Sequence, residues 1–219
     1  MKKNKGFLLL VLLLHFSCSL DSNLKINIDI PAASLVKLEQ YKEIVVTNFW
    51  VPKETKDFNL SQELADYLSF ELGKQFKGKM TSKAISLENE DVFKKQDFWK
   101  NLSPEQKQAL FLTGKAQYTQ ETRKAILEKD KPIVDGPFKT EKKGLTERKI
   151  FTLELSLYLI STETGEALYQ KDFKEMKSDE NPKQTAQFVF YELIQRVKQR
   201  FFRAILGEGK PQERYLITK

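Results

Sequence analysis

The sequence of 219 residues contains one cysteine, Cys18, and one histidine, His15. A single cysteine cannot form a disulfide within the chain. Because both residues precede position 19, the rest of the chain has neither an imidazole nor a thiol. This absence excludes a histidine general base, a cysteine nucleophile and a zinc site built from histidine and cysteine in that part of the chain.

Nucleotide-binding motifs are also absent, since neither G-x-x-x-x-G-K-[ST] nor G-x-G-x-x-G occurs. Aspartates and glutamates are scattered over faces that the sequence pattern assigns to the surface, and no pair has the placement that hydrolytic acid–base catalysis needs. Thr164-Gly165-Glu166 is typical of a turn between two strands. We therefore expect no enzyme activity, no cofactor and no metal site.

The first eighteen residues predict export and lipidation. Three lysines within the first five residues precede the apolar run 7–14. That run is much shorter than the ~20 apolar residues of a membrane-spanning helix and is typical of a signal peptide. Cys18 follows directly after Ser17, which resembles the lipobox of bacterial lipoproteins, although His15 stands where that family usually has leucine. The alternative is an ordinary secretory signal with an incidental cysteine.

This interpretation predicts a signal peptide over 1–17, a lipidated N-terminus and tether over 18–40, and one periplasmic domain over 41–219. The acyl groups on Cys18 would hold the protein on a membrane of the cell envelope, facing the periplasm, and we expect the outer membrane. The formal net charge is +7, and removal of the three signal lysines lowers it to +4. Such a small excess is typical of a solvated surface rather than of a nucleic-acid site.

The strand signals favour a mixed sheet. Residues 43–51 are apolar on both faces, which is typical of a buried central strand. Residues 111–118 form a second strand, in which Gly114 allows close backbone approach. Residues 151–160 alternate between apolar and polar side chains and form a hairpin with 167–176. Two weaker strands are expected at 80–85 and, as an edge strand, at 215–217.

Two long amphipathic helices are expected to cover this sheet. The first has Asn59 as its N-cap, leucines at every fourth position and Gly78 at its end. The second has Asn181 as its N-cap, Pro182 at its first position and Gly207 at its end. Short helices are expected over 91–102 and 104–109, with Phe93, Phe98 and Trp99 as core anchors. The fold class is therefore α/β (α+β), with a mixed sheet of about five strands and two long helices packed on it.

Residues 121–149 differ from the rest of the chain because lysines and turn-forming residues interrupt the apolar periodicity. We interpret this segment as a protruding basic hairpin arm and a candidate partner-binding site. The alternative is a solvated loop without a partner. The candidate contact residues are Lys124, Lys129, Lys131, Phe138, Lys142 and Lys143.

With these elements placed, a family resemblance follows. Residues 30–32 and 41–49, the strand start 111–115 and the hairpin 155–168 with its Thr164-Gly165-Glu166 turn resemble the periplasmic α/β domain of curli-secretion (CsgG-type) and penicillin-binding-protein-activator lipoproteins. The resemblance covers most of 30–206. It implies protein binding or oligomerisation rather than catalysis, and an envelope protein or a second copy as partner.

The LPS-assembly (LptE-type) lipoproteins are the rival resemblance, because they also pack two helices on a small sheet behind a lipidated cysteine. Their usual aromatic-glycine segment after the cysteine is absent here, where the chain reads Ser19-Leu20-Asp21-Ser22. The expected function is accordingly a non-catalytic envelope lipoprotein that binds or scaffolds other proteins. The alternative is an accessory lipoprotein of LPS or lipid assembly and transport.

Overall fold

The computed structural model describes residues 23–30, 33–102, 108–127, 144–179, 181, 183–207 and 210–217. The chain divides into two units. The smaller unit contains strand β1 (Asn23–Ile30), which pairs antiparallel with β7 (Lys210–Ile217). Residues 23–30, expected in the tether, therefore form a strand. The apolar segment 215–217, expected at an edge of the main sheet, pairs with that strand instead.

The larger unit, Ala32–Glu208, contains a five-stranded mixed sheet in the order β3-β2-β4-β5-β6. Its strands are β2 (Glu43–Thr47), β3 (Lys79–Lys83), β4 (Ala109–Leu127), β5 (Gly144–Ser161) and β6 (Ala167–Asp179). Strand β2 runs parallel to both of its neighbours, whereas β5 runs antiparallel to both β4 and β6. With the two long helices, this arrangement confirms the predicted fold class.

The sequence alternation explains how β5 lies in the sheet. Its odd-numbered side chains from Phe151 to Leu159 are buried, whereas Glu154 on the opposite face is exposed. The burial of one face is the reason for the strict period of two. Gly114 of β4 is needed because a Cβ atom there would lie 2.1 Å from the carbonyl oxygen of Ser156. The predicted close backbone approach at this glycine is therefore confirmed.

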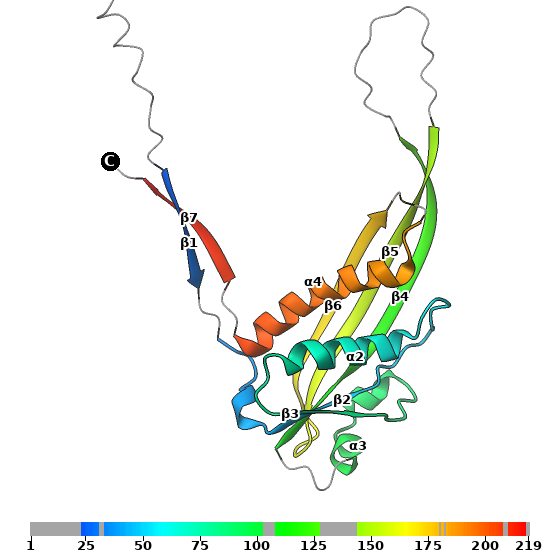
Figure 1. Cartoon of the computed structure of the whole chain (residues 1–219). Helices are drawn as coiled ribbons and strands as arrows, with labels where there is room; N and C mark the ends of the chain where they lie inside the picture. The colour runs from blue at the N-terminus through cyan, green and yellow to red at the C-terminus, as the bar shows by residue number, and fades with distance from the viewer. Residues whose placement is uncertain are drawn as a thin grey trace, which may run out of the picture. The chain divides into compact units, whose positions relative to one another are not determined.

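Helix α2 (Leu60–Gly73) packs one leucine face on the sheet, and Figure 1 shows it beside α4. The predicted N-cap is confirmed, because Asn59 Oδ1 accepts the N–H of Gln62 at 3.0 Å. The four leucines at positions 60, 64, 68 and 72 are completely buried. The helix ends at Gly73, so Gly78 is not its cap. A Cβ atom at Gly78 would instead lie 2.5 Å from the carbonyl oxygen of Lys42.

Helix α4 (Ala186–Leu206) packs beside α2 on the same face of the sheet. The predicted start at Asn181 is wrong, because Thr185 is the N-cap and accepts the N–H of Phe188 at 3.3 Å. The Asn181 side chain accepts the N–H of Lys183 in a separate turn before the helix. At the other end, Gly207 has a φ of 71°, which confirms the predicted left-handed cap.

A smaller apolar cluster lies on the opposite face of the sheet. It is covered by the short helices η2 (Glu90–Lys94) and α3 (Gln96–Asn101). Trp99 is completely buried there, and its Nε1–H donates to the carbonyl oxygen of Val92 at 2.9 Å. Phe93 and Trp99 are core anchors, as predicted. The helix expected over 104–109 is wrong at its end, where Ala109 is the first residue of β4; residues 103–107 lie outside the described part.

Candidate interaction surfaces

The first candidate surface is the two-stranded extension of β4 and β5. These strands pair continuously from Leu110↔Ser161 to Leu127↔Gly144, whereas β6 accompanies β5 only as far as Lys149↔Asp179. Beyond that point the described ribbon has only two strands, and residues 121–124 are exposed. Lys124 is on this ribbon, and its Nζ lies 3.8 Å from a carboxylate oxygen of Glu147. Both side chains are largely exposed, so their ion pair adds little stability.

Of the residues predicted to contact a partner, the structure places only Lys124. Lys129, Lys131, Phe138, Lys142 and Lys143 lie outside the described residues, as does Cys18. The described ends of the segment, 121–127 and 144–149, are paired strands rather than a loop.

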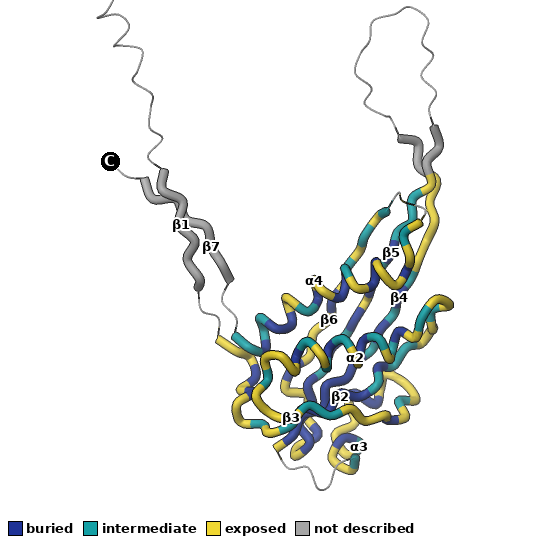
Figure 2. Tube along the Cα trace, viewed as in Figure 1, coloured by how far each residue is buried: buried dark blue, intermediate teal, exposed yellow. Residues whose placement is uncertain are grey.

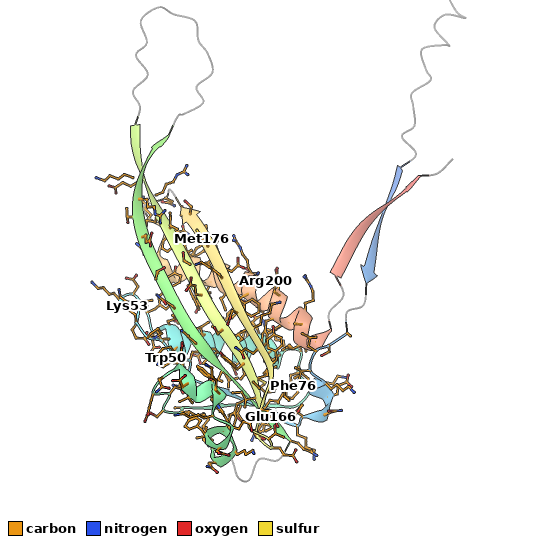
Figure 3. All side chains as sticks on the ribbon, turned by 180° about the vertical axis from the view of Figure 1, so that it is seen from behind. Trp50, Lys53, Phe76, Glu166, Met176 and Arg200 are labelled. Carbon is orange, nitrogen blue, oxygen red and sulfur yellow. The ribbon has the colours of Figure 1, made fainter. Side chains whose placement is uncertain are left out.

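The second candidate surface is a groove of about 950 Å³ that no sequence pattern predicts. It lies where the segment 34–42 passes the C-terminal ends of both long helices. Its apolar walls are Val36, Leu38, Phe76, Ile205 and Leu206. Phe76, labelled in Figure 3, belongs to the segment after α2 that the sequence pattern assigned to the helix itself.

Hydrogen bonds explain why the segment before β2 follows the end of α4. The last carbonyl groups of a helix have no partner within the helix. Here the N–H of Leu35 donates to the carbonyl oxygen of Ala204 at 2.8 Å, and Ser34 Oγ donates to that of Ile205 at 2.5 Å. The segment therefore caps α4 and forms one wall of the groove.

Lysines give this groove a positive rim. Lys37, Lys42 and Lys77 contribute to its lining and are exposed, whereas Glu39 is the one acidic residue among the described lining residues. No ion pair joins any of these three lysines to a carboxylate within the described part of the chain. An apolar cleft with unpaired cations at its edge has the chemistry to hold an anionic amphiphile.

The third candidate surface is an aromatic row across the outer side of the helix layer. Phe70 of α2 is 67% exposed and Phe188 of α4 is 55% exposed. Tyr67 of α2 and Tyr191 of α4 contact each other between the two helices, with ring centroids 6.0 Å apart. Exposed aromatic side chains that gather on one surface are typical of protein contacts. The sequence carried a signal for this row, because Tyr67 and Phe70 lie off the leucine stripe of α2.

Glu63 of α2 forms hydrogen bonds that hold the aromatic row to α4. Its carboxylate accepts hydrogen bonds from the hydroxyl of Tyr191 and, at 2.9 Å, from Nε2 of Gln187. The hydrogen bond to Glu63, followed by burial, raises the pKa of Tyr191 to about 12. The hydroxyl group therefore stays protonated and bound at physiological pH. Figure 2 shows that the helices bury the side facing the sheet and expose the other side.

These surfaces offer contacts rather than reactive groups. Within the described ranges, no group of three His, Cys, Asp or Glu residues is arranged to hold a metal ion. No helix in the same ranges has the length and apolar character needed to span a membrane.

Comparisons with known proteins identify similar folds at low similarity. No protein-family model matches the sequence, and no curated protein matches it. The PelC dodecamer from Paraburkholderia phytofirmans is 12% identical with a TM-score of 0.41, over 80% of this chain and 95% of that one. Lipoprotein GNA1162 from Neisseria meningitidis is 11% identical with a TM-score of 0.36, over 72% and 98%.

A minor lipoprotein from Acinetobacter baumannii is 13% identical, with a TM-score of 0.36, over 78% of this chain and 96% of that one. Bacterial lipoproteins are thus among the structural neighbours.

Proposed function

We propose that this protein is a lipid-anchored, non-catalytic lipoprotein of the bacterial cell envelope whose α/β domain binds another protein. The observation that carries the proposal is the sequence before Cys18, where a positive start and a short apolar run lead to the only cysteine. The absence of histidine and cysteine after that position supports a binding role over catalysis. At the family level, we propose a relationship to the CsgG-type and penicillin-binding-protein-activator lipoproteins.

The anchor is tested by replacing the acylated residue. Cys18→Ala should abolish labelling by a fatty-acid analogue and release the protein from envelope membranes. Several acyl chains bind persistently, because each buried CH₂ contributes about 0.8 kcal/mol whereas a single chain binds only marginally. Ser17→Ala, which keeps a small residue before the cysteine, is the control and should remain labelled. Retention of the Cys18→Ala protein on membranes after a high-salt wash would refute the lipid anchor.

The basic arm is the proposed protein-binding site. Its described ribbon presents Arg123 and Lys124 on strands that neither helix covers. A variant in which a short Gly-Ser turn replaces residues 128–144 should keep the fold, because all core side chains that the structure describes stay in place. It should lose the partners that the parent protein captures from crosslinked envelopes. Capture of the same partners at the same yield would show that the arm is not the interface.

The groove favours a second candidate function, in lipid assembly or transport. Its lysine rim matches an anionic headgroup and its apolar walls match an acyl chain. Near a membrane surface, each lysine contributes about 1 kcal/mol of attraction to anionic lipid. A lipid role therefore predicts that the protein, carrying Cys18→Ser to remove its own acyl chains, binds vesicles of phosphatidylglycerol and not of phosphatidylcholine.

Matched lysine variants test this second role. The rim variant replaces Lys37, Lys42 and Lys77 by serine, and the control makes the same change at Lys53, Lys56 and Lys100, which are also exposed. Both variants lose the same net charge, so nonspecific attraction to the vesicles falls equally. Vesicle binding should be lost only in the rim variant. Equal loss in both would assign the binding to net charge and reject the groove as a lipid site.

A further inference from the structure

The outer edge of β6 has no neighbouring strand in the part of the chain that the structure describes. Strand β6 is 13 residues long and is the last strand in the sheet order, with β5 as its neighbour on one side. Among the residues that the structure describes, no strand pairs with its other side. Figure 1 shows β6 at this edge of the sheet. Such an edge presents a row of backbone N–H and C=O groups to any strand that can pair with it.

The charges of β6 are arranged symmetrically about Phe173. The sequence there is Lys171-Asp172-Phe173-Lys174-Glu175. If a second copy of the strand runs antiparallel with Phe173 opposite Phe173, Lys171 lies opposite Glu175 and Asp172 opposite Lys174. Each pair occurs twice because of the two-fold symmetry, which gives four cross-strand pairs of opposite charge. Such pairs stabilise antiparallel strands, whereas like charges directly opposite each other destabilise them.

The neighbouring registers are unfavourable. Antiparallel pairing places directly opposite side chains on the same face of the sheet, so the register changes in steps of two residues. One step in one direction brings Asp172 opposite Asp172, and one step in the other brings Lys174 opposite Lys174. The charge pattern therefore favours the register centred on Phe173 over both of its neighbours.

The protomer leaves two of these charges available for a partner. Neither Lys171 nor Asp172 forms an ion pair within the described part of the protomer, and both are exposed. Lys174 lies 2.6 Å from Glu154 on the face opposite the helices, where its side chain remains 63% exposed. Glu175 lies on the helix face and is held by the guanidinium group of Arg200. Its second carboxylate oxygen lies 3.9 Å from Arg196. Ion pairs therefore hold Lys174 on one face of β6 and Glu175 on the other.

Phe173 would lie on the two-fold axis. It is 4% exposed, and the guanidinium carbon of Arg200 lies 5.3 Å from the centroid of its ring. Figure 3 shows Arg200 and Met176 at this part of the molecule. The Phe173 ring is already covered within each protomer, so backbone hydrogen bonds and the four charge pairs provide the attraction between the two strands.

We propose that β6 is a self-association surface, whose occupant is β6 of a second copy of this chain, paired antiparallel about Phe173. The two five-stranded sheets then form one continuous ten-stranded sheet with two-fold symmetry. This inference rests on strand order and charge and does not depend on the lipid anchor or on the arm.

Charge reversal at Asp172 and Lys174 tests the proposal. The protein, carrying Cys18→Ser to prevent acylation and disulfides, is examined by sedimentation velocity over a range of concentrations. The parent should dimerise. Asp172→Lys and Lys174→Asp should each weaken dimerisation by roughly tenfold or more, because each turns two attractive pairs into two repulsive ones. At concentrations where the parent is monomeric, Asp172→Lys should unfold at the temperature of the parent. Lys174→Asp should unfold slightly below it, because two like charges replace the exposed ion pair with Glu154.

Mixing the two variants provides the decisive measurement. In the mixed dimer, one strand carries lysine at 172 and 174 and the other carries aspartate at both, so all cross-strand contacts between these positions are attractive. The mixture should therefore dimerise more tightly than either variant does alone. A parent that stays monomeric at all concentrations, or a dimer that neither single reversal weakens, would overturn the proposal.

Disulfide trapping reports the register. A mixture of Asp172→Cys and Lys174→Cys proteins should form a crosslinked heterodimer under mild oxidation, because these positions are directly opposite in the proposed pairing. A mixture of Asp172→Cys and Ser178→Cys proteins, which are not opposite, is the control. Equal crosslinking in both mixtures would contradict this register.

Discussion

The hydroxyl of Tyr118 donates a hydrogen bond of 2.8 Å to the carbonyl oxygen of Ala186, which joins β4 to the first turn of α4. Tyr169 of β6 is as deeply buried, at 5% exposed against 7% for Tyr118. Its hydroxyl oxygen, however, has no hydrogen-bond partner among the described residues. The same chemical group is therefore satisfied at one position of the sheet and unsatisfied at another.

Phenylalanine substitutions should separate these two tyrosines. Tyr118→Phe should lower the free energy of unfolding by about 0.5–1.5 kcal/mol, because a hydrogen bond is lost. Tyr169→Phe should leave it unchanged or raise it, because an unsatisfied polar atom leaves the core. Urea unfolding of both variants at pH 7 measures the difference. Equal losses in the two variants would contradict the assignment of the Tyr118 hydrogen bond.

Two glycines should differ strongly in their tolerance of alanine. Gly114→Ala should prevent normal folding or cost several kcal/mol, because the new Cβ atom meets the Ser156 backbone and the ring of Phe49. Gly73→Ala is the control. Its Cβ atom would lie 3.5 Å from Met80, an ordinary contact, and alanine favours the helix by about 0.5–1 kcal/mol. Thermal unfolding followed by circular dichroism should show one large loss and one small gain.

The leucine stripe of α2 predicts a further pair of variants. Leu68→Ala should cost about 2–5 kcal/mol, because the side chain is completely buried against the sheet. Phe70→Ala removes a larger side chain that is 67% exposed and should change the stability by less than about 0.5 kcal/mol. Denaturant unfolding measures both. A larger loss for Phe70 would mean that the helix buries a different face.

Periodicity made the central elements predictable. The leucines of α2 and the alternating side chains of β5 each repeat with the period of the buried face, so the sequence predicts both the element and its orientation. A helix boundary is harder to predict where two suitable cap residues lie within one turn of each other. Asn181 and Thr185 are both residue types that cap helices well. The Asn181 side chain is used in a turn before the helix, and α4 begins after Thr185.

The candidate surfaces depend on residues that are distant in sequence, and most were missed for that reason. The groove joins the segments 34–42, 75–78 and 205–206, and no local pattern reports that they meet. The open edge of β6 depends on strand order, since the hairpin of β5 and β6 does not show whether another strand follows. Lys124, in contrast, was predicted as an exposed residue of the arm, because the interrupted periodicity around it is local.

The last prediction concerns alkaline pH. Burial raises the pKa of Tyr169 from 10.0 to about 12, and burial, with a smaller effect of Asp57, raises that of Tyr118 further. In the unfolded chain both phenols ionise near pH 10, whereas in the folded protein they remain neutral. The stability that they contribute is therefore fully present below pH 10 and is lost as the pH rises through the folded-state values.

Each pKa unit corresponds to about 1.4 kcal/mol, so the fall between pH 9 and pH 12 should be measurable by urea unfolding. The free energy of unfolding of the Tyr169→Phe variant should be similar to that of the parent at pH 8. Over the range from pH 9 to pH 12 it should fall less than that of the parent. Lysines also titrate here, but they do so equally in both proteins and cancel in the difference. Parallel stability curves for the parent and the variant would show that the Tyr169 phenol ionises as freely in the folded protein as in the unfolded chain.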